Sequence, residues 1–344
     1  MQTTQRVGLV GAGPATQAIH LPTLKMFGDQ IQVTHIVDPN VTLAEAVAAP
    51  LDAHASGSLD DMLADGVDIA VVASPNAFHA AQIQALCAAG VKGIMAEKPL
   101  ATTGDEAQAV AGAVRAAGTA LVVGAMHLYD PAWIAAHESM AEHVTAPIRV
   151  RCATYLPPNS YYEDQATKMI RPPAPPEPAE PPSAADVLRG GVLGLAIHDL
   201  PLIRRFIPSL DNVSKAETAT PWGYAITAEG QAGSVELLAR MGDTWQADWT
   251  LQISSEDGAN LTMQMPPSYV HVGSATATVS GVPGSPATTF GPYKTDGYIA
   301  EWQELLAIMD GATPRYSLDD MMADFMYALA LADLAVAAND GEQS

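Results

Sequence analysis

The chain has 344 residues, 48% of them hydrophobic, and a formal net charge of −22. This length predicts two domains, and the hydrophobic content is ample for two cores. Such an acidic chain disfavours nucleic acids and anionic membranes as partners. No segment is recognised as an apolar run of membrane-spanning length, and no basic segment followed by an apolar one indicates secretion, so a cytoplasmic location is expected.

Alternating apolar and alanine-rich segments run through residues 1–125, and the apolar ones predict strands. These predicted strands are 6–10, 31–37, 68–73, 92–95 and 119–123. Strands that alternate with helices in this way are typical of a doubly wound parallel sheet. We therefore predict an α/β fold with a Rossmann domain over 1–125.

The remaining residues, 126–344, have the composition of a second, α+β domain. Segments rich in threonine and valine predict antiparallel strands at 147–155, 213–219, 232–240, 245–254 and 260–266, and 298–309 and 318–337 predict helices. Residues 171–182 hold seven prolines in twelve positions and predict a stiff loop. This loop is either an inert insertion or a wall or lid over the active site.

The two cysteines, Cys87 and Cys152, lie far apart in apolar surroundings typical of small core residues. Neither a disulfide framework nor a metal site is predicted.

A glycine-rich turn follows the first predicted strand and leads into a helix-compatible segment that reaches Lys25. Glycines in such a turn let the backbone bend sharply and let a pyrophosphate approach, and the first helical turn offers free N–H groups. Thr16 stands where the usual fingerprint has a third glycine, which weakens the match. The residues predicted to contact the dinucleotide are Gly11, Gly13, Pro14, Ala15 and Thr16.

The second predicted strand ends at Asp38, close to where a carboxylate hydrogen-bonds the adenosine ribose of a dinucleotide. A carboxylate there repels a 2′-phosphate, which favours NAD over NADP. The alternative is that Asp38 only caps the following helix.

Ser74, Pro75 and Asn76 follow the third predicted strand, at the carboxyl edge where dinucleotides bind in such sheets. Asn76 and His79 are candidates to border the nicotinamide, although His79 can equally cap or pack its helix.

The next strand delivers Glu97-Lys98-Pro99 to the same edge, where Glu97 and Lys98 are further candidates to contact the cofactor. A partly desolvated Lys98 can hold a substrate hydroxyl and have its pKa lowered. An exposed lysine that only adds solubility is the alternative.

Together these segments resemble the glucose-fructose oxidoreductase, inositol dehydrogenase and rhizopine catabolism (Gfo/Idh/MocA) family of NAD(P)-dependent oxidoreductases, over nearly the whole chain. The segments that carry the resemblance are Gly11–Pro22, Ser74–His79, Ala96–Leu100, Tyr129–Pro131 and Gly190–Asp199. The resemblance implies a second domain with an open, mainly antiparallel sheet, whose face commonly forms homodimers or homotetramers. It also implies oxidation or reduction of secondary alcohols on sugars and cyclitols.

The same resemblance makes Lys98 the catalytic lysine and His198 the acid/base, a role that suits imidazole at neutral pH. Gly194 stands where many relatives carry an aspartate one helical turn before this histidine, and Ala196 replaces a usual glycine. Asp199 cannot present its carboxylate on the same face, because adjacent helical residues point about 100° apart.

His127, Tyr129, Asp130 and Asp199 are candidate substrate contacts. For the three that precede Pro131, packing and helix capping are equally plausible functions.

The predicted reaction transfers a hydride from a carbinol carbon to NAD, while His198 accepts the hydroxyl proton and Lys98 holds the oxygen. Residues 126–344 carry 27 acidic against 11 basic residues, which favours a cationic substrate, for example the 3″-hydroxyl of an aminoglycoside in antibiotic biosynthesis before amination. Solubility is the alternative reason for this charge. A ketosugar reductase, a redox-neutral enzyme that cleaves a glycoside on retained NAD, and a non-catalytic NAD-binding sensor remain open.

Overall fold

The computed structural model describes residues 4–172, 181–242, 247–269 and 271–342, so most of the proline-rich segment 171–182 lies outside the described residues. The chain divides into two compact units. The first comprises the described residues of Met1–Gly124, Glu163–Glu177 and Glu301–Met322. The second comprises those of Ala125–Tyr162, Pro178–Ala300 and Ala323–Ser344.

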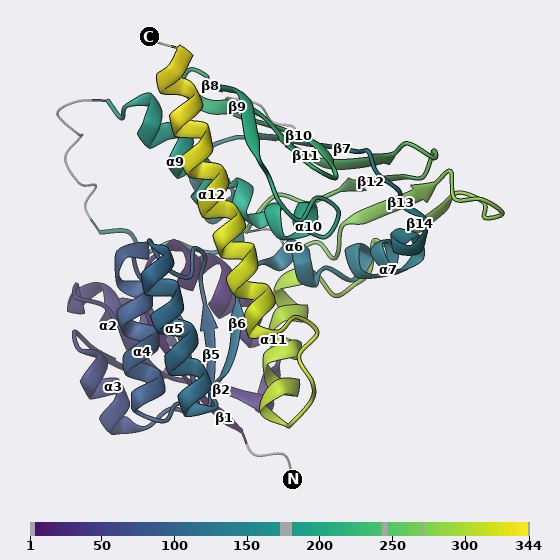
Figure 1. Ribbon diagram of the computed structural model, residues 1–344. Helices are drawn as coiled ribbons and strands as arrows, with labels where there is room; N and C mark the ends of the chain where they lie inside the picture. The colour runs from purple at the N-terminus through teal and green to yellow at the C-terminus, as the bar shows by residue number, and fades with distance from the viewer. Residues whose placement is uncertain (1–3, 173–180, 243–246, 270, 343–344) are drawn as a thin grey trace. The chain divides into compact units, whose positions relative to one another are not determined.

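A six-stranded parallel sheet forms the centre of the first unit (Figure 1). Its strands lie in the order β3-β2-β1-β4-β5-β6, so the order reverses between β1 and β4, where doubly wound sheets bind dinucleotides. The strands are β1 (Gln5–Val10), β2 (Ile31–Val37), β3 (His54–Ser56), β4 (Ile69–Val72), β5 (Gly93–Ala96) and β6 (Ala120–Val123). Every residue of β4 and β5 is buried, as in a sheet covered on both faces.

Helices connect these strands, and three of them begin at residues whose side chains cap the first turn. The connecting helices are α1 (Leu21–Lys25), α2 (Val41–Ala48), α3 (Leu59–Asp65), α4 (His79–Ala88) and α5 (Gly104–Ala117). Ser58 caps α3 by accepting from Asp60 N, and Thr103 and Glu106 form a capping box at α5. The predicted doubly wound sheet is confirmed.

An eight-stranded mixed sheet forms the second unit, in the order β14-β13-β12-β11-β7-β10-β9-β8. Its strands are β7 (Ile148–Leu156), β8 (Asn212–Thr218), β9 (Trp222–Gly230), β10 (Gly233–Met241), β11 (Asp248–Ser255), β12 (Asn260–Gln264), β13 (Thr276–Ser280) and β14 (Thr288–Phe290). The pair β7 and β10 is parallel, and the other strand pairs of the sheet are antiparallel. The predicted mainly antiparallel sheet is thus confirmed.

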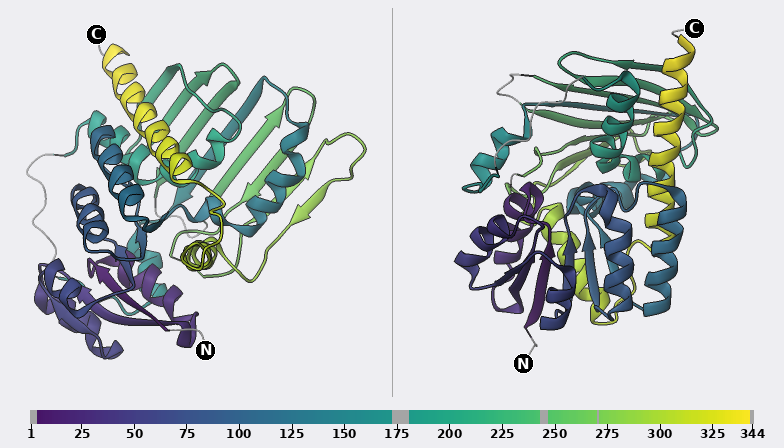
Figure 2. Two further views of the ribbon diagram at one scale, coloured as in Figure 1. Left: turned by 60° about the horizontal axis from the view of Figure 1, so that its bottom comes forward. Right: turned by 90° about the vertical axis from the view of Figure 1, so that its left-hand side faces the viewer.

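Helices lie on one face of this sheet, where α7 and α9 contact its strands (Figure 2). The helices that belong wholly to this unit are α6 (Met126–Tyr129), α7 (Pro131–Met140), α9 (Ala184–Gly194) and α10 (Leu200–Arg204). The residues of α8 (Asn159–Ala166) and α11 (Gly297–Met309) are divided between the two units. Strand β7 alternates as a strand covered on one face does: Val150 and Cys152 are buried, and Arg149 and Arg151 are exposed.

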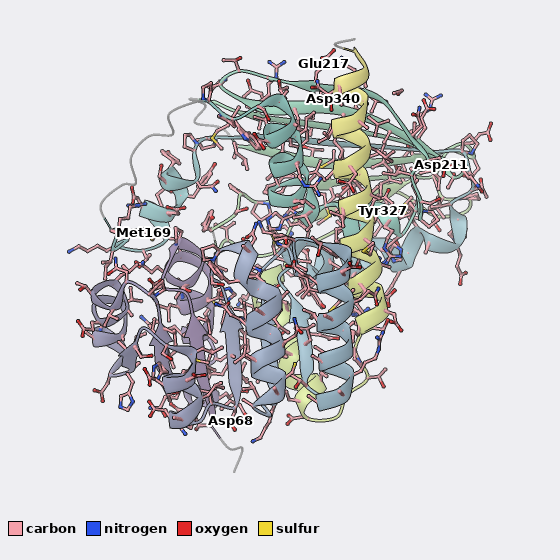
Figure 3. The ribbon with its side chains drawn as sticks, turned by 60° about the vertical axis from the view of Figure 1, so that its left-hand side comes forward. Asp68, Met169, Asp211, Glu217, Tyr327 and Asp340 are labelled. Atoms are coloured by element: carbon pink, nitrogen blue, oxygen red, sulfur yellow. The ribbon has the colours of Figure 1, made fainter. Side chains whose placement is uncertain are left out.

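The sequence was expected to contain no apolar segment of membrane-spanning length. The C-terminal helix α12 (Leu318–Glu342) corrects this expectation, because Leu318–Asp340 is long and apolar enough to cross a membrane. Half of its most apolar window is nevertheless buried inside the protein. Asp324 on this helix accepts hydrogen bonds from Arg204 (2.5 Å) and Arg205 (2.8 Å), and Tyr327, labelled in Figure 3, is buried. These contacts are those of a helix packed within a folded unit.

Candidate active site

The glycine-rich turn after β1 requires glycine at its first position. Gly11 has φ +103°, and a Cβ there would lie 2.5 Å from the carbonyl oxygen of Ala73, just after β4. A Cβ on Gly13 would meet no atom within 4 Å. Gly11 therefore lets β1 and β4 approach each other, and Gly13 leaves the backbone open to a ligand such as a pyrophosphate.

Thr16, which replaces the third glycine, is built into the turn. It is fully buried, and its Oγ1 donates a hydrogen bond to the carbonyl oxygen of Gly11 (2.5 Å). Gln17 Nε2 donates to the carbonyl oxygen of Ala12 (2.8 Å). The chain then forms a π-helical turn, Thr16–His20, before α1. These side-chain bonds hold the turn where the usual fingerprint relies on close backbone packing.

Asp38 lies at the end of β2 and contacts the same turn. Its Oδ2 accepts from the N–H of Ala12 (2.9 Å), and its Oδ1 accepts from the N–H of Asn40 (2.8 Å). Asn40, and not Asp38, caps α2 by accepting from Leu43 N (3.2 Å). The carboxylate is therefore held beside the predicted phosphate-binding turn.

His79 joins the Ser74–His79 segment to the segment that carries Lys98. Its ring lies between two carbonyl oxygens, with Nε2 2.7 Å from Ser74 O and Nδ1 2.8 Å from Pro99 O, and it is 1% exposed. We therefore assign His79 a positioning role, the second of its two predicted functions. Pro75 and Asn76 are exposed and remain available to a cofactor.

Glu97 and Lys98 form a charged pair at the carboxyl end of β5. Burial lowers the pKa of the Lys98 ammonium below its ordinary value, and the negative charge of Glu97 opposes this effect. Burial alone would raise the pKa of Glu97, but its hydrogen bond with His20 (3.0 Å) and the charges of His20 and Lys98 bring it below the usual value. This desolvated lysine next to a carboxylate fits an active-site group better than a solubilising one.

In the second unit, Asp199 is the centre of a buried hydrogen-bond network. Its Oδ1 accepts from His127 Nδ1 (2.8 Å), and its Oδ2 accepts from Trp249 Nε1 (2.9 Å) and from the thiol of Cys152 (3.2 Å). The residue is 1% exposed, so its carboxylate is not accessible to a substrate. This differs from the expectation that Asp199 contacts the substrate. Asp199 is instead a positioning residue for His127.

His198 is half-buried, and its ring lies 5.9 Å from the rings of both His127 and Trp249, measured between centroids. It closes a short 3₁₀ turn, Ala196–His198, that follows the end of α9 at Gly194. Because the helix ends between them, Gly194 and His198 do not lie on one regular helical turn. A Cβ on Gly194 would meet no atom within 4 Å, so a larger side chain can be accommodated there.

The Tyr129-Asp130 segment is buried, and Asp130 caps α7. Its carboxylate accepts from Ala132 N and Ala275 N, each at 2.8 Å. Burial raises the pKa of Asp130 despite these bonds. The capping function named as an alternative in the sequence analysis is the one that fits this geometry.

Replacing Asp199 by alanine is expected to lower the free energy of unfolding by about 3–5 kcal/mol, because the change leaves buried donors without their anionic acceptor. Urea unfolding followed by tryptophan fluorescence measures the loss. Asp211→Ala, at an exposed position, is the control and should stay within about 0.5 kcal/mol of the wild type. A loss below about 1 kcal/mol in Asp199→Ala would show that the network contributes little.

Residues 5–125 match the profile of the oxidoreductase family with an NAD-binding Rossmann fold, GFO_IDH_MocA. These residues therefore have the sequence pattern of this family's NAD-binding domain. The resemblance predicted from the sequence is confirmed. An inositol 2-dehydrogenase/D-chiro-inositol 3-dehydrogenase of Shouchella clausii (strain KSM-K16) is 34% identical over 154 residues, which are 43% of this chain and 44% of that relative. The chain thus matches less than half the length of this curated relative.

Solved structures share the fold over almost the whole chain at low sequence identity. GenD2 from gentamicin A biosynthesis, in complex with NAD, has a TM-score of 0.71 at 20% identity and covers 98% of this chain and 95% of its own. KijD10, a 3-ketoreductase from Actinomadura kijaniata in complex with TDP-benzene and NADP, has a TM-score of 0.71 at 18% identity. The match covers 95% of this chain and 96% of KijD10. These likenesses show the fold.

Proposed function

We propose that this protein oxidises a secondary hydroxyl of a sugar or cyclitol to a ketone, with NAD as the acceptor. The observation that carries the proposal is the half-buried Lys98 beside Glu97, whose pKa is lowered by burial, at the carboxyl edge of a sheet that matches an NAD-binding fold. The open backbone at Gly13 fits a pyrophosphate, and the inositol dehydrogenase relative supports a polyhydroxylated substrate.

Gly11, Gly13 and Asp38 would hold NAD, which would supply the acceptor for the hydride. Lys98 holds the substrate oxygen through its ammonium group. His198 accepts the hydroxyl proton as the carbinol hydrogen leaves as a hydride, and the oxygen becomes the carbonyl oxygen of the ketone. His79 keeps the Lys98 segment in place through the Pro99 carbonyl, and Asp199 orients His127.

Within this class we favour a cationic substrate, such as an aminoglycoside oxidised at its 3″-hydroxyl. The net charge of −22 attracts polycations, and exposed acids such as Asp211, Glu217 and Asp340 lie in the second unit (Figure 3). The fold shared with GenD2 from gentamicin A biosynthesis supports the same choice.

A panel of neutral sugars, inositols and aminoglycosides tests the substrate. NADH absorbance is followed with NAD at low and high ionic strength. We expect a signal with aminoglycosides whose KM rises steeply with salt, because screening weakens long-range attraction. A signal confined to neutral cyclitols, or a KM that salt leaves unchanged, would assign the acidic charge to solubility instead.

The second candidate is a ketosugar reductase, which the shared fold of the 3-ketoreductase KijD10 favours. It would use the same residues in the reverse direction, so NADH consumption with a ketosugar, without oxidation of any alcohol in the panel, would identify it.

For the assembly and location we propose a cytoplasmic homodimer or homotetramer. The two buried, free cysteines agree with a reducing compartment.

Asp38→Asn is expected to change the cofactor preference. The amide can still accept from Ala12 N but no longer repels a 2′-phosphate. The ratio of kcat/KM for NAD to that for NADP should fall about tenfold, which corresponds to about 1.4 kcal/mol. Asp61→Asn, an exposed change in the same unit, is the control. Equal use of both cofactors by the wild type would contradict the proposed NAD preference.

Gly194→Asp is expected to raise kcat/KM about tenfold by placing a carboxylate near His198 that can stabilise its protonated form. The position is exposed and has space for the side chain. Gly190→Asp on the same helix, also exposed and with open space, is the matched control and should give no gain. No gain from Gly194→Asp would mean that Lys98 and His198 do not need this carboxylate.

A further inference from the structure

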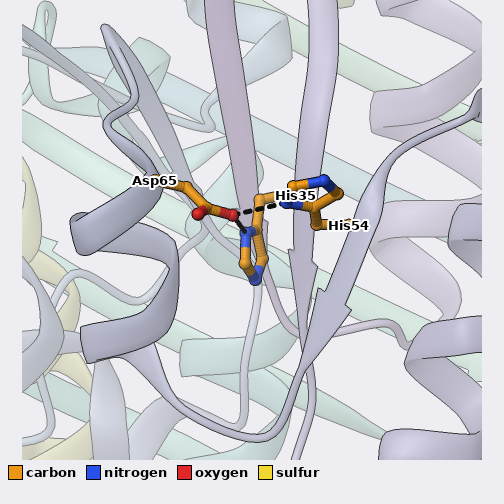
Figure 4. Close-up of side chains that lie close together, drawn as sticks. All are labelled: His35, His54 and Asp65. Atoms are coloured by element: carbon orange, nitrogen blue, oxygen red, sulfur yellow. Dashed lines mark hydrogen bonds and ion pairs between the residues drawn. The ribbon is translucent and has the colours of Figure 1, made fainter.

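Three side chains of the first unit converge at one point (Figure 4). His35 lies on β2, His54 lies opposite it on β3, and Asp65 ends α3. His35 Nδ1 is 3.0 Å and His54 Nδ1 is 2.6 Å from the same Asp65 oxygen, Oδ2. The three potential ligand atoms all lie within 4.8 Å of one another.

The hydrogen bonds around His35 determine which of its nitrogens carries a proton. Ser56 Oγ donates to the carbonyl oxygen of Ser58 (3.0 Å), so it accepts from His35 Nε2 (2.8 Å). With the proton on Nε2, a neutral ring directs the Nδ1 lone pair at the Asp65 carboxylate. Two lone pairs at this distance repel each other unless a positive charge, either a proton or a metal ion, lies between them.

The exposed fractions of the three side chains also suit an ion that enters from solvent. His35 is 3% exposed and is fixed by the sheet, whereas His54 is 74% and Asp65 37% exposed. The cluster thus has one buried imidazole, one exposed imidazole and one partly exposed carboxylate.

We propose that His35, His54 and Asp65 bind a divalent transition-metal ion, with Zn²⁺ as the best fit. Imidazole nitrogens and one carboxylate oxygen suit Zn²⁺ and not Mg²⁺ or Ca²⁺, which prefer oxygen ligands. Tetrahedral zinc at about 2.0–2.1 Å from its ligands separates them by roughly 3.3 Å. Small movements of the exposed His54 and Asp65 supply this separation, and water completes the coordination.

The Ser56 hydroxyl, which orients His35 through Nε2, is the kind of outer-shell partner that histidine ligands of zinc have. The ion would connect β2, β3 and the end of α3. Strand β2 ends immediately before Asp38, the residue predicted to hydrogen-bond the adenosine ribose. Metal binding would therefore stabilise the part of the sheet that positions Asp38.

Isothermal titration of metal-free protein with ZnCl₂, in the absence of NAD, tests the site. We expect one Zn²⁺ per chain, no binding of MgCl₂, and an increase of Tm with Zn²⁺. His54→Ala and Asp65→Asn should weaken Zn²⁺ binding at least about tenfold, and Ser56→Ala by about tenfold. Because His54 and Asp65 are substantially exposed, these two variants are expected to fold.

Two matched controls separate this site from adventitious zinc. Asp61→Asn changes another exposed acid of α3, and His143→Ala removes an exposed histidine of the second unit. Both should bind Zn²⁺ like the wild type. The proposal is overturned if the wild type binds no Zn²⁺ at millimolar concentration, or if His54→Ala and Asp65→Asn bind as tightly as the controls.

Discussion

Replacing Lys98 by methionine is expected to lower kcat about a thousandfold while NAD binding stays unchanged. Methionine keeps much of the length and apolar volume of the lysine stem but removes the ammonium that holds the substrate oxygen. The loss should therefore appear in the chemical step. Steady-state turnover and quenching of tryptophan fluorescence by NAD measure the two quantities separately.

The pH profile of the wild type gives a second readout for Lys98. A protonated ammonium is the active form, so the rate should fall as pH rises through the Lys98 pKa. Burial lowers this pKa, and the fall should therefore begin below the ordinary lysine value of 10.5. Lys92→Met, at an exposed lysine of the same unit, is the control. Wild-type turnover in Lys98→Met would remove the lysine from the mechanism.

His198→Ala is expected to lower kcat by about 10²–10⁴-fold, the usual contribution of a positioned general base. Its ring neighbours His127 and Trp249 remain, and Trp249 keeps its bond to Asp199, so the fold of the unit should persist. Turnover and NAD binding are measured as for Lys98.

His143→Ala, at an exposed position, controls for the loss of a histidine elsewhere in the second unit. A rate in His198→Ala within a factor of a few of the wild type would mean that another group, such as His127, accepts the proton.

The parallel strands could be predicted because fully buried strands are continuous apolar runs. Segments 68–73 and 92–95 correspond to the fully buried strands β4 (Ile69–Val72) and β5 (Gly93–Ala96). Strand β3 was missed because it has three residues, none of them strongly apolar. In the second unit β9, β13 and β14 were missed, and the parallel pairing of β7 with β10 depends on contacts between segments about 85 residues apart, which periodicity does not reveal.

Side-chain partners were harder to predict than strands. Thr16 weakens the fingerprint as a sequence pattern, yet its hydroxyl stabilises the turn by bonding to Gly11 O. Asp199 follows His198 and was expected near the substrate, but its partners His127, Cys152 and Trp249 come from distant segments that only the fold assembles. The same holds for His35, His54 and Asp65, whose convergence depends on the register of β2 with β3, so no metal site was predicted from the sequence.

The measurement that tests the proposed dehydrogenase most directly is the stoichiometry of NADH and keto product. Enzyme and NAD are incubated with the alcohol that gives the strongest signal in the panel, NADH is quantified by absorbance, and the ketone is quantified by mass spectrometry. We expect one NADH for each ketone formed, with neither product in Lys98→Met. Conversion of substrate without accumulation of NADH would contradict net oxidation and would indicate a redox-neutral enzyme that returns the hydride in each cycle.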